Sequence, residues 1–387
     1  MIATDKKCIC ITTGYFAPHH GGVEKYTYNL SRQLSNKGFK VIIVTTNSEF
    51  VNDSEYIGNI ELIRLPVFKL FRKRYPLLNI FHKRYRYYIN YLKKQKIDYY
   101  ILNTRFYLTT FLGLRLSFKK NKKSIIIEHG TGHFVSGNFI INFCASQYEH
   151  LLTSFVKTFH PLFFGVSEAC NNWLKHYKIT ADGVVYNGID ANLDLHIVPI
   201  FRKKYNIPDN HLILSCASRL IPEKGAIELL NAFIKANSKY ENMHLIIAGD
   251  GPLLDDIHNK YGGINHIHIT GKITYEEVMT LFHESDIVIN PSRYPEGLPT
   301  VILEAGLANR AMISTAMGGA KEVIENGYSG IIINQCSESE IASAIEELYL
   351  NPEKRVAMAN NLYKNVTDNF NWNKITEGLL SSDYFKD

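Results

Sequence analysis

The chain has 387 residues, of which 45% are hydrophobic and 21% are charged, and its formal net charge is +6. This length favours two domains over a single core, and the balance of apolar and charged residues excludes an intrinsically disordered chain. Residues 1–7 lack the apolar core of a signal peptide, and no stretch reaches the ~18 apolar residues of a membrane-spanning helix. We therefore expect a globular protein that is cytoplasmic or peripherally membrane-associated.

The six cysteines are scattered, and several lie inside apolar runs. No Cys-x-x-Cys pair or His-x-x-His spacing accompanies them. This pattern favours buried thiols in a reducing compartment over disulfides or metal ligands. The predicted buried thiols are Cys8, Cys10, Cys144, Cys170, Cys216 and Cys336.

In the first half of the chain, short β-rich runs alternate with helical patterns. A helix is predicted at residues 23–36, where the periodicity stops before Gly38. The apolar or β-branched runs predict strands at residues 8–13, 41–46, 99–103, 124–128 and 162–166. Strands separated by helices in this way form a parallel sheet with crossover helices.

The second half begins after the polar stretch 190–209, which we interpret as a linker. The same patterns predict strands at residues 212–217, 244–248, 267–270, 286–290, 311–315 and 330–333, and helices at 226–238, 253–261 and 300–308. A further helix begins at Thr274, because Glu277 three residues later completes a capping box. The last amphipathic stretch contains Trp372 and is long enough to fold back over the first domain.

Both halves therefore predict doubly wound parallel sheets. Open sheets of this kind bind ligands beyond the carboxyl ends of their strands, at the point where the strand order reverses. Two such sheets that face each other form a cleft between domains. The residues that directly follow the strands are thus the candidate site residues.

Two of these loops can bind phosphate. Gly21-Gly22 precedes the first helix, where paired glycines let backbone N–H groups approach a phosphate or a sugar; a plain strand-to-helix turn is the alternative. The G-x-G-x-x-G fingerprint of nicotinamide binding is lacking. Arg219 and Lys224 follow the first strand of the second half, and together they can neutralise a diphosphate. The alternative is that they are two ordinary surface cations.

Two further loops carry groups that hydrogen-bond to sugars. Glu296 lies in the loop after strand 286–290, and Glu304 lies one turn into the next helix. Carboxylates accept hydrogen bonds from vicinal hydroxyls, so one could hold a ribose and the other a sugar ring. The alternative is that Glu304 caps a helix or pairs with a surface lysine. His129 directly follows strand 124–128, where an imidazole can donate to a sugar hydroxyl or steady a developing charge; a structural histidine is the alternative.

Taken together, these segments resemble the retaining glycosyltransferases of family 4, which have the GT-B fold. The matches occur in the family's order and span nearly the whole chain. They are Gly21-Gly22-Val23-Glu24, His129-Gly130, Tyr186-Asn187-Gly188-Ile189-Asp190, Arg219 to Lys224 followed by Gly225, Gly249-Asp250-Gly251, and the Glu-x7-Glu from Glu296 to Glu304. The sequence Glu-Gly-Leu-Pro after Pro295 departs from the commoner Glu-Gly-Phe-Gly motif. It looks like the variant frequent in bacterial polysaccharide enzymes and leaves the donor sugar open.

The resemblance implies an α/β protein of GT-B fold, with two Rossmann-like doubly wound parallel-sheet domains facing across a cleft. We assign residues 1–195 to an acceptor-side domain and residues 196–366 to a nucleotide-sugar-binding domain. Residues 367–387 are expected to form a C-terminal helix that folds back on the first domain.

The resemblance also implies roles for residues near the donor phosphates. Arg219 and Lys224 would bind the diphosphate, and Gly22 would approach it from the first domain. Gly21 and Gly249, which belong to the matched glycine motifs, are expected among the donor-binding residues.

On the sugar and nucleoside side, Glu304 would bind the ribose, and Glu296 with the amides of Gly297 and Leu298 would hold the transferred sugar. His129 would touch that sugar near the reaction centre, and Ile273 would contact the base. The expected catalytic residues are His129, Glu296, Arg219 and Lys224.

Members of the resembled family keep the anomeric configuration by a front-face route in which the leaving phosphate accepts the acceptor's proton. This route needs no enzyme nucleophile. Cations that stabilise the leaving diphosphate fit an electrostatic mechanism and make a metal unnecessary. No Asp-x-Asp follows an apolar strand. We therefore expect a nucleotide-sugar as substrate, with no metal and no other cofactor.

A basic block at residues 69–96 contains ten Lys or Arg and no Asp or Glu, interleaved with aromatic side chains. Such a block can dock on an anionic membrane surface or bind RNA, and a solvated charged helix is the third interpretation. Relatives in the resembled family often use lipid-linked acceptors, so we favour docking on the inner face of the cytoplasmic membrane and expect no nucleic-acid partner. The expected docking residues are Lys69, Arg72, Lys73, Arg74, Lys83, Arg84 and Arg86.

The predicted function is transfer of a sugar from a UDP- or GDP-linked donor to a glycan or lipid-linked acceptor in cell-surface polysaccharide biosynthesis. One alternative is a nucleotide-sugar epimerase of GT-B fold, which would act without an acceptor. Another is a catalytically silent protein that binds membrane or nucleic acid. The joint presence of Arg219, Lys224, Glu296 and Glu304 argues against a silent protein.

Overall fold

The computed structural model describes residues 6–19, 21–68, 76–133, 139–190 and 198–386. The chain divides into two compact units. Unit 1 comprises Met1–Asn187 and Trp372–Asp387, and unit 2 comprises Gly188–Asn371. Our sequence-based boundaries at 195/196 and 366/367 therefore differ by several residues from these divisions.

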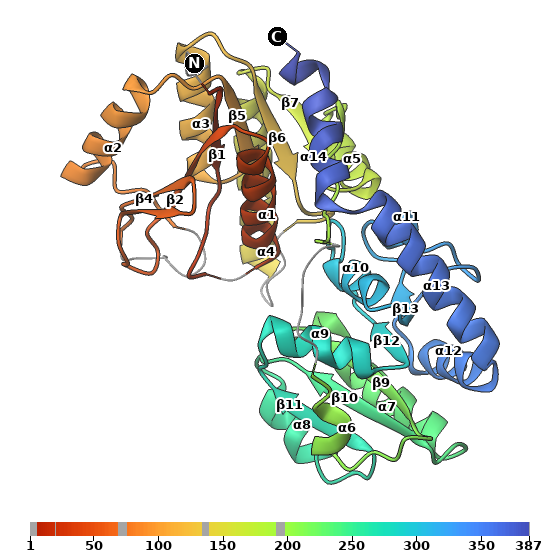
Figure 1. Ribbon diagram of the computed structural model, residues 1–387. Helices are drawn as coiled ribbons and strands as arrows, with labels where there is room; N and C mark the ends of the chain where they lie inside the picture. Colours follow the sequence, from red (N-terminus) through yellow and green to blue (C-terminus); the bar gives the residue numbers. More distant parts are fainter. Residues whose placement is uncertain (1–5, 20, 69–75, 134–138, 191–197, 387) are drawn as a thin grey trace. The chain divides into compact units, whose positions relative to one another are not determined.

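Unit 1 is built on an eight-stranded sheet with the strand order β3-β4-β2-β1-β5-β6-β7-β8 (Figure 1). Its strands are β1 (Cys8–Thr12), β2 (Lys40–Thr46), β3 (Ser54–Ile57), β4 (Ile60–Leu65), β5 (Tyr99–Asn103), β6 (Ser124–Glu128), β7 (Leu162–Gly165) and β8 (Gly183–Val184). Neighbouring strands are parallel, except that β3 pairs with β4 in the antiparallel sense. The central strands β1, β5 and β6 are buried along their whole length, as expected where helices cover both faces of a parallel sheet.

The helices of unit 1 include one contributed by the end of the chain. They are α1 (Gly22–Asn36), α2 (Lys83–Lys94), α3 (Leu108–Lys119), α4 (Phe139–Lys157), α5 (Glu168–Leu174) with the 3-10 turn η1 (Lys175–Tyr177), and α14 (Trp372–Ser381) with η3 (Asp383–Phe385). Helix α14 packs along α1, where the Trp372 ring meets the Tyr26 ring at 5.2 Å. The hydroxyl of Tyr384 accepts from the Tyr100 amide at 2.7 Å, so the chain end is tied to β5.

Unit 2 contains a six-stranded parallel sheet with the order β11-β10-β9-β12-β13-β14. The strands are β9 (Leu212–Ala217), β10 (Met243–Ala248), β11 (Ile267–Gly271), β12 (Ile287–Asn290), β13 (Ala311–Thr315) and β14 (Ile331–Ile333). The helical elements are α6 (Phe201–Lys204), η2 (Pro222–Lys224), α7 (Ala226–Asn237), α8 (Leu254–Tyr261), α9 (Tyr275–Glu284), α10 (Thr300–Leu307), α11 (Ala320–Val323), α12 (Glu338–Leu350) and α13 (Pro352–Asn369). The predicted capping box at Thr274 and Glu277 is confirmed at the start of α9.

Each sheet has one point at which the strand order reverses. In unit 2, β9 lies between β10 and β12, so the chain leaves β9 on one side and later returns to its other side. In unit 1, β1 lies in the same way between β2 and β5. The loops that follow these strands occupy the positions where doubly wound folds bind ligands.

Three sequence-based expectations differ from the structure. Cys144 on α4 is exposed, although the other thiols are buried or half-buried and all six are free. The expected linker 190–209 contains the short helix α6. Neither strand of the β3–β4 hairpin was predicted: β3 is an edge strand whose residues are mostly exposed and carry no apolar alternation, whereas β4 is buried along its whole length. Among the residues that the structure describes, no helix is both long and apolar enough to cross a bilayer.

Candidate functional site

Two loops meet at the point where the strand order of unit 2 reverses, one carrying two cations and the other a carboxylate. The loop after β9 carries Arg219 and Lys224, and the loop after β12 carries Tyr294. The Arg219 guanidinium lies 5.7 Å and the Lys224 ammonium 5.5 Å from the centre of the Tyr294 ring. Because β9 and β12 are neighbours in the sheet, the topology itself brings these loops together.

Lys224 and Glu296 form an ion pair between the same two loops. Their side chains are 14% and 17% exposed, so both charges are largely removed from water. Burial, and then the positive charge of Arg219, lower the pKa of Lys224 to about 8. The contacting Glu296 carboxylate acts in the opposite direction and favours the charged ammonium.

Two glycines allow the loops around β9 to approach this closely. Gly225 has a φ of +71°, and a Cβ there would lie 2.3 Å from the Pro291 carbonyl oxygen in the loop after β12. Gly249 has a φ of +144°, and a Cβ there would lie 1.8 Å from the Ser218 carbonyl oxygen. Larger residues at either position would force the backbone of the site apart.

The remaining predicted residues of unit 2 follow the same loops. Glu304 is buried in the second turn of α10, the helix that begins directly after the loop of Glu296. Leu298 is buried in that loop, and the Gly297 carbonyl accepts from the Gly319 amide at 2.8 Å. Ile273 precedes α9 and packs against the apolar cluster beneath the sheet. The structure thus places Lys224 and Glu296 in contact, while no interaction joins Ile273 to either of them among the described contacts.

In unit 1, His129 directly follows β6 and lies beside β5. Its Nε2 is 2.9 Å from the Oδ1 of Asn103, the last residue of β5, and its ring meets the Tyr26 ring at 4.6 Å. Burial lowers the pKa of His129 to about 3, so the imidazole is neutral at physiological pH. Asn103 was not among the predicted site residues.

Gly21 and Gly22 stand at the amino-terminal end of α1. Gly21 is the capping position, and a Cβ added at Gly22 would meet no atom within 4 Å. Nearby, Glu24 of the first turn pairs with His19 Nδ1 at 3.1 Å, and His19 stacks on Tyr15. Gly22 is therefore open to its surroundings, as close approach of a ligand to the backbone requires.

The basic block is only partly within the described residues. Lys69, Arg72, Lys73 and Arg74 lie outside them, whereas Lys83, Arg84 and Arg86 are exposed in the first turn of α2. Most aromatic residues of α2 are partly buried: Tyr85, Tyr88 and Tyr91 pack against the core of unit 1. The block is also not free of acidic partners, because Arg84 forms a 2.5 Å ion pair with Asp53 from a distant part of the sequence.

Comparisons with known proteins show the family to which the chain belongs. The sequence model described as "Glycosyltransferase Family 4" matches residues 20–193, and that described as "Glycosyl transferases group 1" matches residues 198–365. An uncharacterized glycosyltransferase of Methanocaldococcus jannaschii is 29% identical over 385 residues, which cover 95% of each chain. A phosphatidylinositol N-acetylglucosaminyltransferase subunit of Saccharomyces cerevisiae is 22% identical over 94% of this chain and 80% of its own.

Solved structures give the same fold. Anabaena HepE, solved in complex with UDP-glucose, superposes with a TM-score of 0.74 at 18% identity, over 96% of this chain and 98% of HepE. The two family matches cover nearly the whole chain, one on each sheet. The chain is therefore an enzyme of the family 4 glycosyltransferases and has their GT-B fold.

Proposed function

We propose that unit 2 binds a UDP- or GDP-linked sugar at the reversal point of its sheet. The observation that carries this proposal is the convergence of Arg219, Lys224 and Glu296 on the loops after β9 and β12. Two cations and a carboxylate lie at one strand end, where Lys224 and Glu296 are largely buried and Arg219 is exposed. Their charges match those of a sugar diphosphate and its hydroxyls. The HepE complex, which holds UDP-glucose, supports a donor of this class.

Within this proposal each predicted residue keeps one role. Arg219 and Lys224 bind the diphosphate. Gly249 has no side chain, so the loop after β10 can lie close to the loop after β9 that carries these cations. Glu296, with Gly297 and Leu298, holds the transferred sugar. The buried carboxylate of Glu304 binds the ribose, and Ile273 lies beside the base.

Unit 1 is proposed to supply Gly21, Gly22 and His129 to the reaction. The backbone at Gly22 is open and lies at the amino-terminal end of α1, where the helix N–H groups and the positive end of the helix dipole favour a group with negative charge. His129 is neutral and uses Nε2 for Asn103. It would therefore act as a hydrogen-bonding group to the sugar, without gaining or losing a proton.

The proposed reaction retains the anomeric configuration. The bond between the anomeric carbon and the leaving diphosphate breaks, the acceptor oxygen bonds from the same face, and the diphosphate takes the acceptor's proton. Negative charge grows on the diphosphate as this bond breaks, so Arg219 and Lys224 stabilise the transition state more than the ground state. The proposal requires neither an enzyme nucleophile nor a metal at the phosphates.

The acceptor is proposed to enter through unit 1. A hollow of about 420 Å³ opens beyond the carboxyl ends of β2 and β4, where Asn47, Val51, Asp53 and Val67 line it together with Arg84 from α2. Next to it, Phe81 and Tyr87 are 77% and 66% exposed beside the cations of α2. A hollow bordered by cations and exposed aromatic rings suits a glycan or lipid-linked acceptor presented at an anionic membrane. The yeast relative, whose name includes phosphatidylinositol, supports a lipid acceptor.

The pathway follows from the same proposal. The variant Glu-Gly-Leu-Pro motif and a lipid-linked acceptor fit the assembly of a cell-surface polysaccharide such as O-antigen, capsule or exopolysaccharide. The enzyme would then work at the inner face of the cytoplasmic membrane.

A donor screen tests the proposal. Thermal unfolding of the purified chain is measured with UDP-, GDP- and ADP-sugars, and the bound donor is then offered a panel of glycan and lipid-linked acceptors. We expect one nucleotide class to raise the unfolding temperature, and NMR of the product to show the anomeric configuration of the donor. Arg219→Ala and Lys224→Ala should abolish the shift, whereas Lys235→Ala, an exposed lysine on α7, should keep it.

The outcomes separate the alternatives. An epimerase would convert the sugar nucleotide with no acceptor present. A silent protein would show no shift with any nucleotide sugar. An inverted product would refute the proposed front-face route while leaving the donor site intact.

A further inference from the structure

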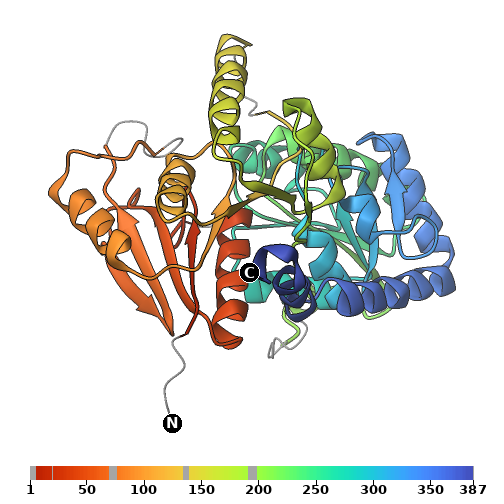
Figure 2. The same cartoon turned by 90° about the horizontal axis from the view of Figure 1, so that it is seen from above.

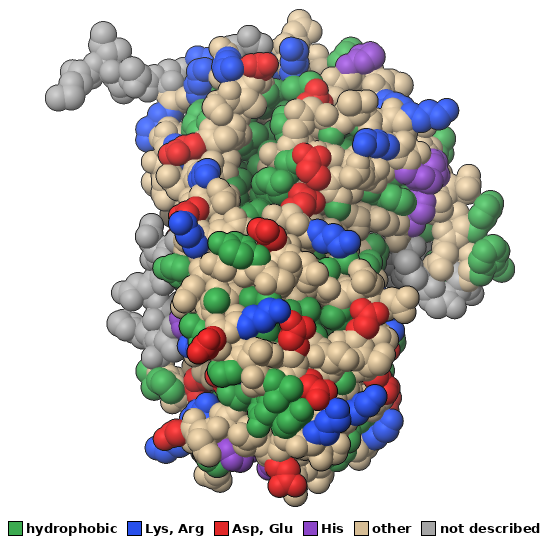
Figure 3. Space-filling view, turned by 90° about the vertical axis from the view of Figure 1, so that its right-hand side faces the viewer, with side chains coloured by type: hydrophobic (Ala, Val, Ile, Leu, Met, Phe, Trp, Pro, Cys, Tyr) green, Lys and Arg blue, Asp and Glu red, His purple; other side chains and the backbone are tan. Residues whose placement is uncertain are grey.

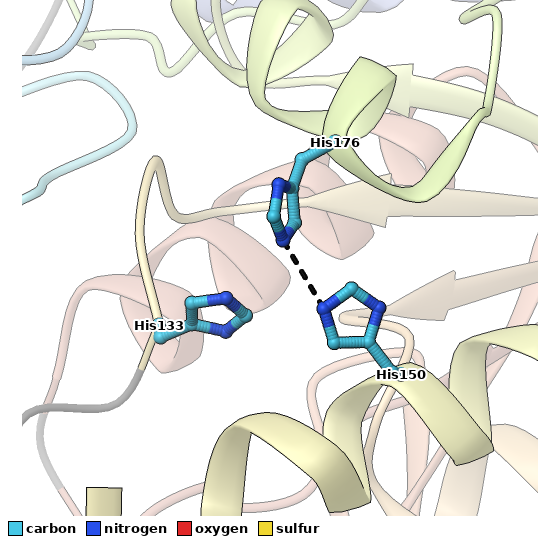
Figure 4. A group of neighbouring side chains, drawn as sticks. All are labelled: His133, His150 and His176. Atoms are coloured by element: carbon cyan, nitrogen blue, oxygen red, sulfur yellow. Dashed lines mark hydrogen bonds between the residues drawn. The ribbon is translucent and has the colours of Figure 1, made fainter. Parts of the chain in front are cut away.

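Unit 1 brings three histidines together outside the candidate donor site. His133 lies in the loop after β6, His150 on α4 and His176 in η1, and one ring nitrogen of each lies within 4.8 Å of the others. Figure 4 shows the three rings directed toward a common space from these separate segments. The sequence spacing of the three does not correspond to a known metal-binding motif, so the group is visible only in the folded chain.

For His150 and His176, the spacing of the ring nitrogens is close to that of a metal site. Nε2 of His150 and Nε2 of His176 are 3.1 Å apart. Two nitrogens bound to one tetrahedral Zn²⁺ at 2.0–2.1 Å lie about 3.4 Å apart. Trp173 stacks on His176 with its ring centre at 4.9 Å and an angle of 5°, which holds that imidazole in place.

Glu149 orients the third imidazole. Its Oε2 lies 3.1 Å from Nδ1 of His133 and accepts from the Tyr177 hydroxyl at 2.9 Å. A carboxylate on one ring nitrogen fixes the tautomer and leaves the other nitrogen for an ion, as in most protein histidine–metal sites. Here that nitrogen is Nε2, which lies 3.3 Å from the Ser146 hydroxyl, a group that can rotate away.

The charges beside the trio favour a cation. Arg105 pairs with both Glu128 and Glu149, and these three side chains are 1%, 3% and 8% exposed. One guanidinium against two carboxylates leaves one negative charge in a place where charge is costly unless it is balanced. A dication bound by the trio would balance this charge.

We infer that His133, His150 and His176 form a binding site for a transition-metal dication of the zinc type, a class for which imidazole ligands are well suited. His176 is exposed, so a fourth position is open to water or to another ligand. The ion would join the loop after β6 and η1 to α4. That helix projects from unit 1 (Figure 2) and exposes apolar side chains, which Figure 3 shows at the right edge of the molecule. The site would therefore anchor the base of this helix.

Metal binding to the full chain tests the inference. The protein is treated with a chelator, desalted, and titrated with Zn²⁺ by calorimetry and by competition with a chromophoric chelator. We expect one Zn²⁺ per chain, a visible absorption spectrum of tetrahedral Co²⁺ when cobalt replaces zinc, and slower hydrogen exchange along α4 in the zinc-bound protein. Glu149→Gln should weaken zinc affinity about 10- to 100-fold, the usual effect of losing a carboxylate that orients a ligand.

Matched variants distinguish this site from adventitious binding. His150→Asn and His176→Asn should each lose the zinc and the exchange protection of α4, and the exposed position of His176 makes its variant the safer one for folding. His211→Asn is the control, because His211 belongs to a second imidazole cluster in which His244 uses Nε2 for His211 and Nδ1 for His268, at 3.2 and 3.0 Å. The inference is overturned if the wild type binds no stoichiometric zinc, or if His176→Asn binds it as tightly as His211→Asn does.

Discussion

The hydrogen bond between His129 and Asn103 fixes which nitrogen of the imidazole carries the proton. The Asn103 amide nitrogen donates to the Thr27 hydroxyl at 2.9 Å, and that hydroxyl donates to the Val23 carbonyl at 2.7 Å. The Asn103 oxygen must therefore accept, so His129 donates from Nε2 across the 2.9 Å contact. This series of hydrogen bonds leaves Nδ1 of His129 as an acceptor, and burial keeps the imidazole neutral.

We predict that Asn103→Leu lowers turnover about 2- to 10-fold, the cost of one lost hydrogen bond, because His129 would lose its fixed tautomer. Nitrogen chemical shifts measured by NMR should show a protonated Nε2 in the wild type and a mixture in the variant. Asn103→Asp should raise the pKa of His129, since a carboxylate beside Nε2 favours the charged ring.

Thr27→Val removes the hydroxyl that accepts from the Asn103 amide, so it should also produce a mixture of His129 tautomers. Thr376→Val is the matched control, because the Thr376 hydroxyl likewise donates to a carbonyl one turn earlier, at 2.7 Å, but lies in α14. Equal tautomer ratios in the wild type and Thr27→Val would contradict the assignment.

The second prediction concerns the two cations of the donor site. Arg219→Ala and Lys224→Ala should each weaken donor binding about 10- to 100-fold, since a charge-assisted contact to phosphate is worth about 1.5–3 kcal/mol. Affinity is measured by calorimetry with the donor found in the screen, and circular dichroism checks that the fold is intact. Unchanged donor affinity in both variants would remove Arg219 and Lys224 from the site.

The third prediction is a pH dependence of donor binding. The pKa of Lys224 is lowered to about 8 by burial and by Arg219. The ammonium is charged below this value and loses its charge as the pH rises through it, so donor KM should increase above about pH 8. Lys224→Arg should bind the donor at both pH 7 and pH 9, because a guanidinium stays charged. A donor KM that is constant up to pH 10 in the wild type would contradict the role of Lys224.

The sequence predicted the buried strands well because they are continuous apolar runs between turn residues. Strands 99–103, 124–128, 212–217 and 311–315 are confirmed at both ends. Helix α4 was not predicted, since its apolar residues do not form a single face: Phe139, Ile140 and Leu151 are 82%, 70% and 70% exposed. Which residues of α4 are buried depends on contacts with other elements of unit 1, and not on a pattern within the helix.

Contacts between distant segments were beyond the reach of the sequence. Arg219 and Glu296 were found as strand-end residues, but the direct Lys224–Glu296 contact depends on β9 and β12 being neighbours. In the same way, Asn103 meets His129 only because β5 pairs with β6. Both contacts depend on the order of the strands in the sheet, which no local sequence pattern encodes.

The fourth prediction is that sugar transfer continues in EDTA. In the proposed site the phosphate charge is met by Arg219, Lys224 and helix ends, so chelation should change donor KM and turnover little. The assay is run well below the unfolding temperature of the chelated protein, because EDTA would also remove an ion from the trio of His133, His150 and His176. His176→Asn serves as the control, since its turnover should be the same with and without EDTA. An absolute requirement for added Mn²⁺ or Mg²⁺ would contradict the proposed donor site.

The fifth prediction is attachment to anionic membranes through the basic block at residues 69–96. The purified protein should float with vesicles that contain anionic lipid, and binding should fall as salt rises, because charges are screened beyond about 8 Å at physiological salt. The exposed rings of Phe81 and Tyr87 should preserve part of the binding at high salt. Replacing Arg72, Lys73, Arg74, Lys83, Arg84 and Arg86 with Gln should release the protein while donor binding in unit 2 is unchanged.

A smaller pair of variants isolates the described part of the block. Lys83→Gln, Arg84→Gln and Arg86→Gln together remove three exposed cations from the start of α2. Lys119→Gln, Lys122→Gln and Lys123→Gln remove the same charge from exposed positions between the end of α3 and the start of β6, an interior strand of the same sheet. A general electrostatic attraction would weaken equally in both, whereas docking through α2 weakens only in the first. Equal flotation of the wild type and both triple variants would leave α2 as a solvated helix, and the acceptor would then have to reach unit 1 from solution.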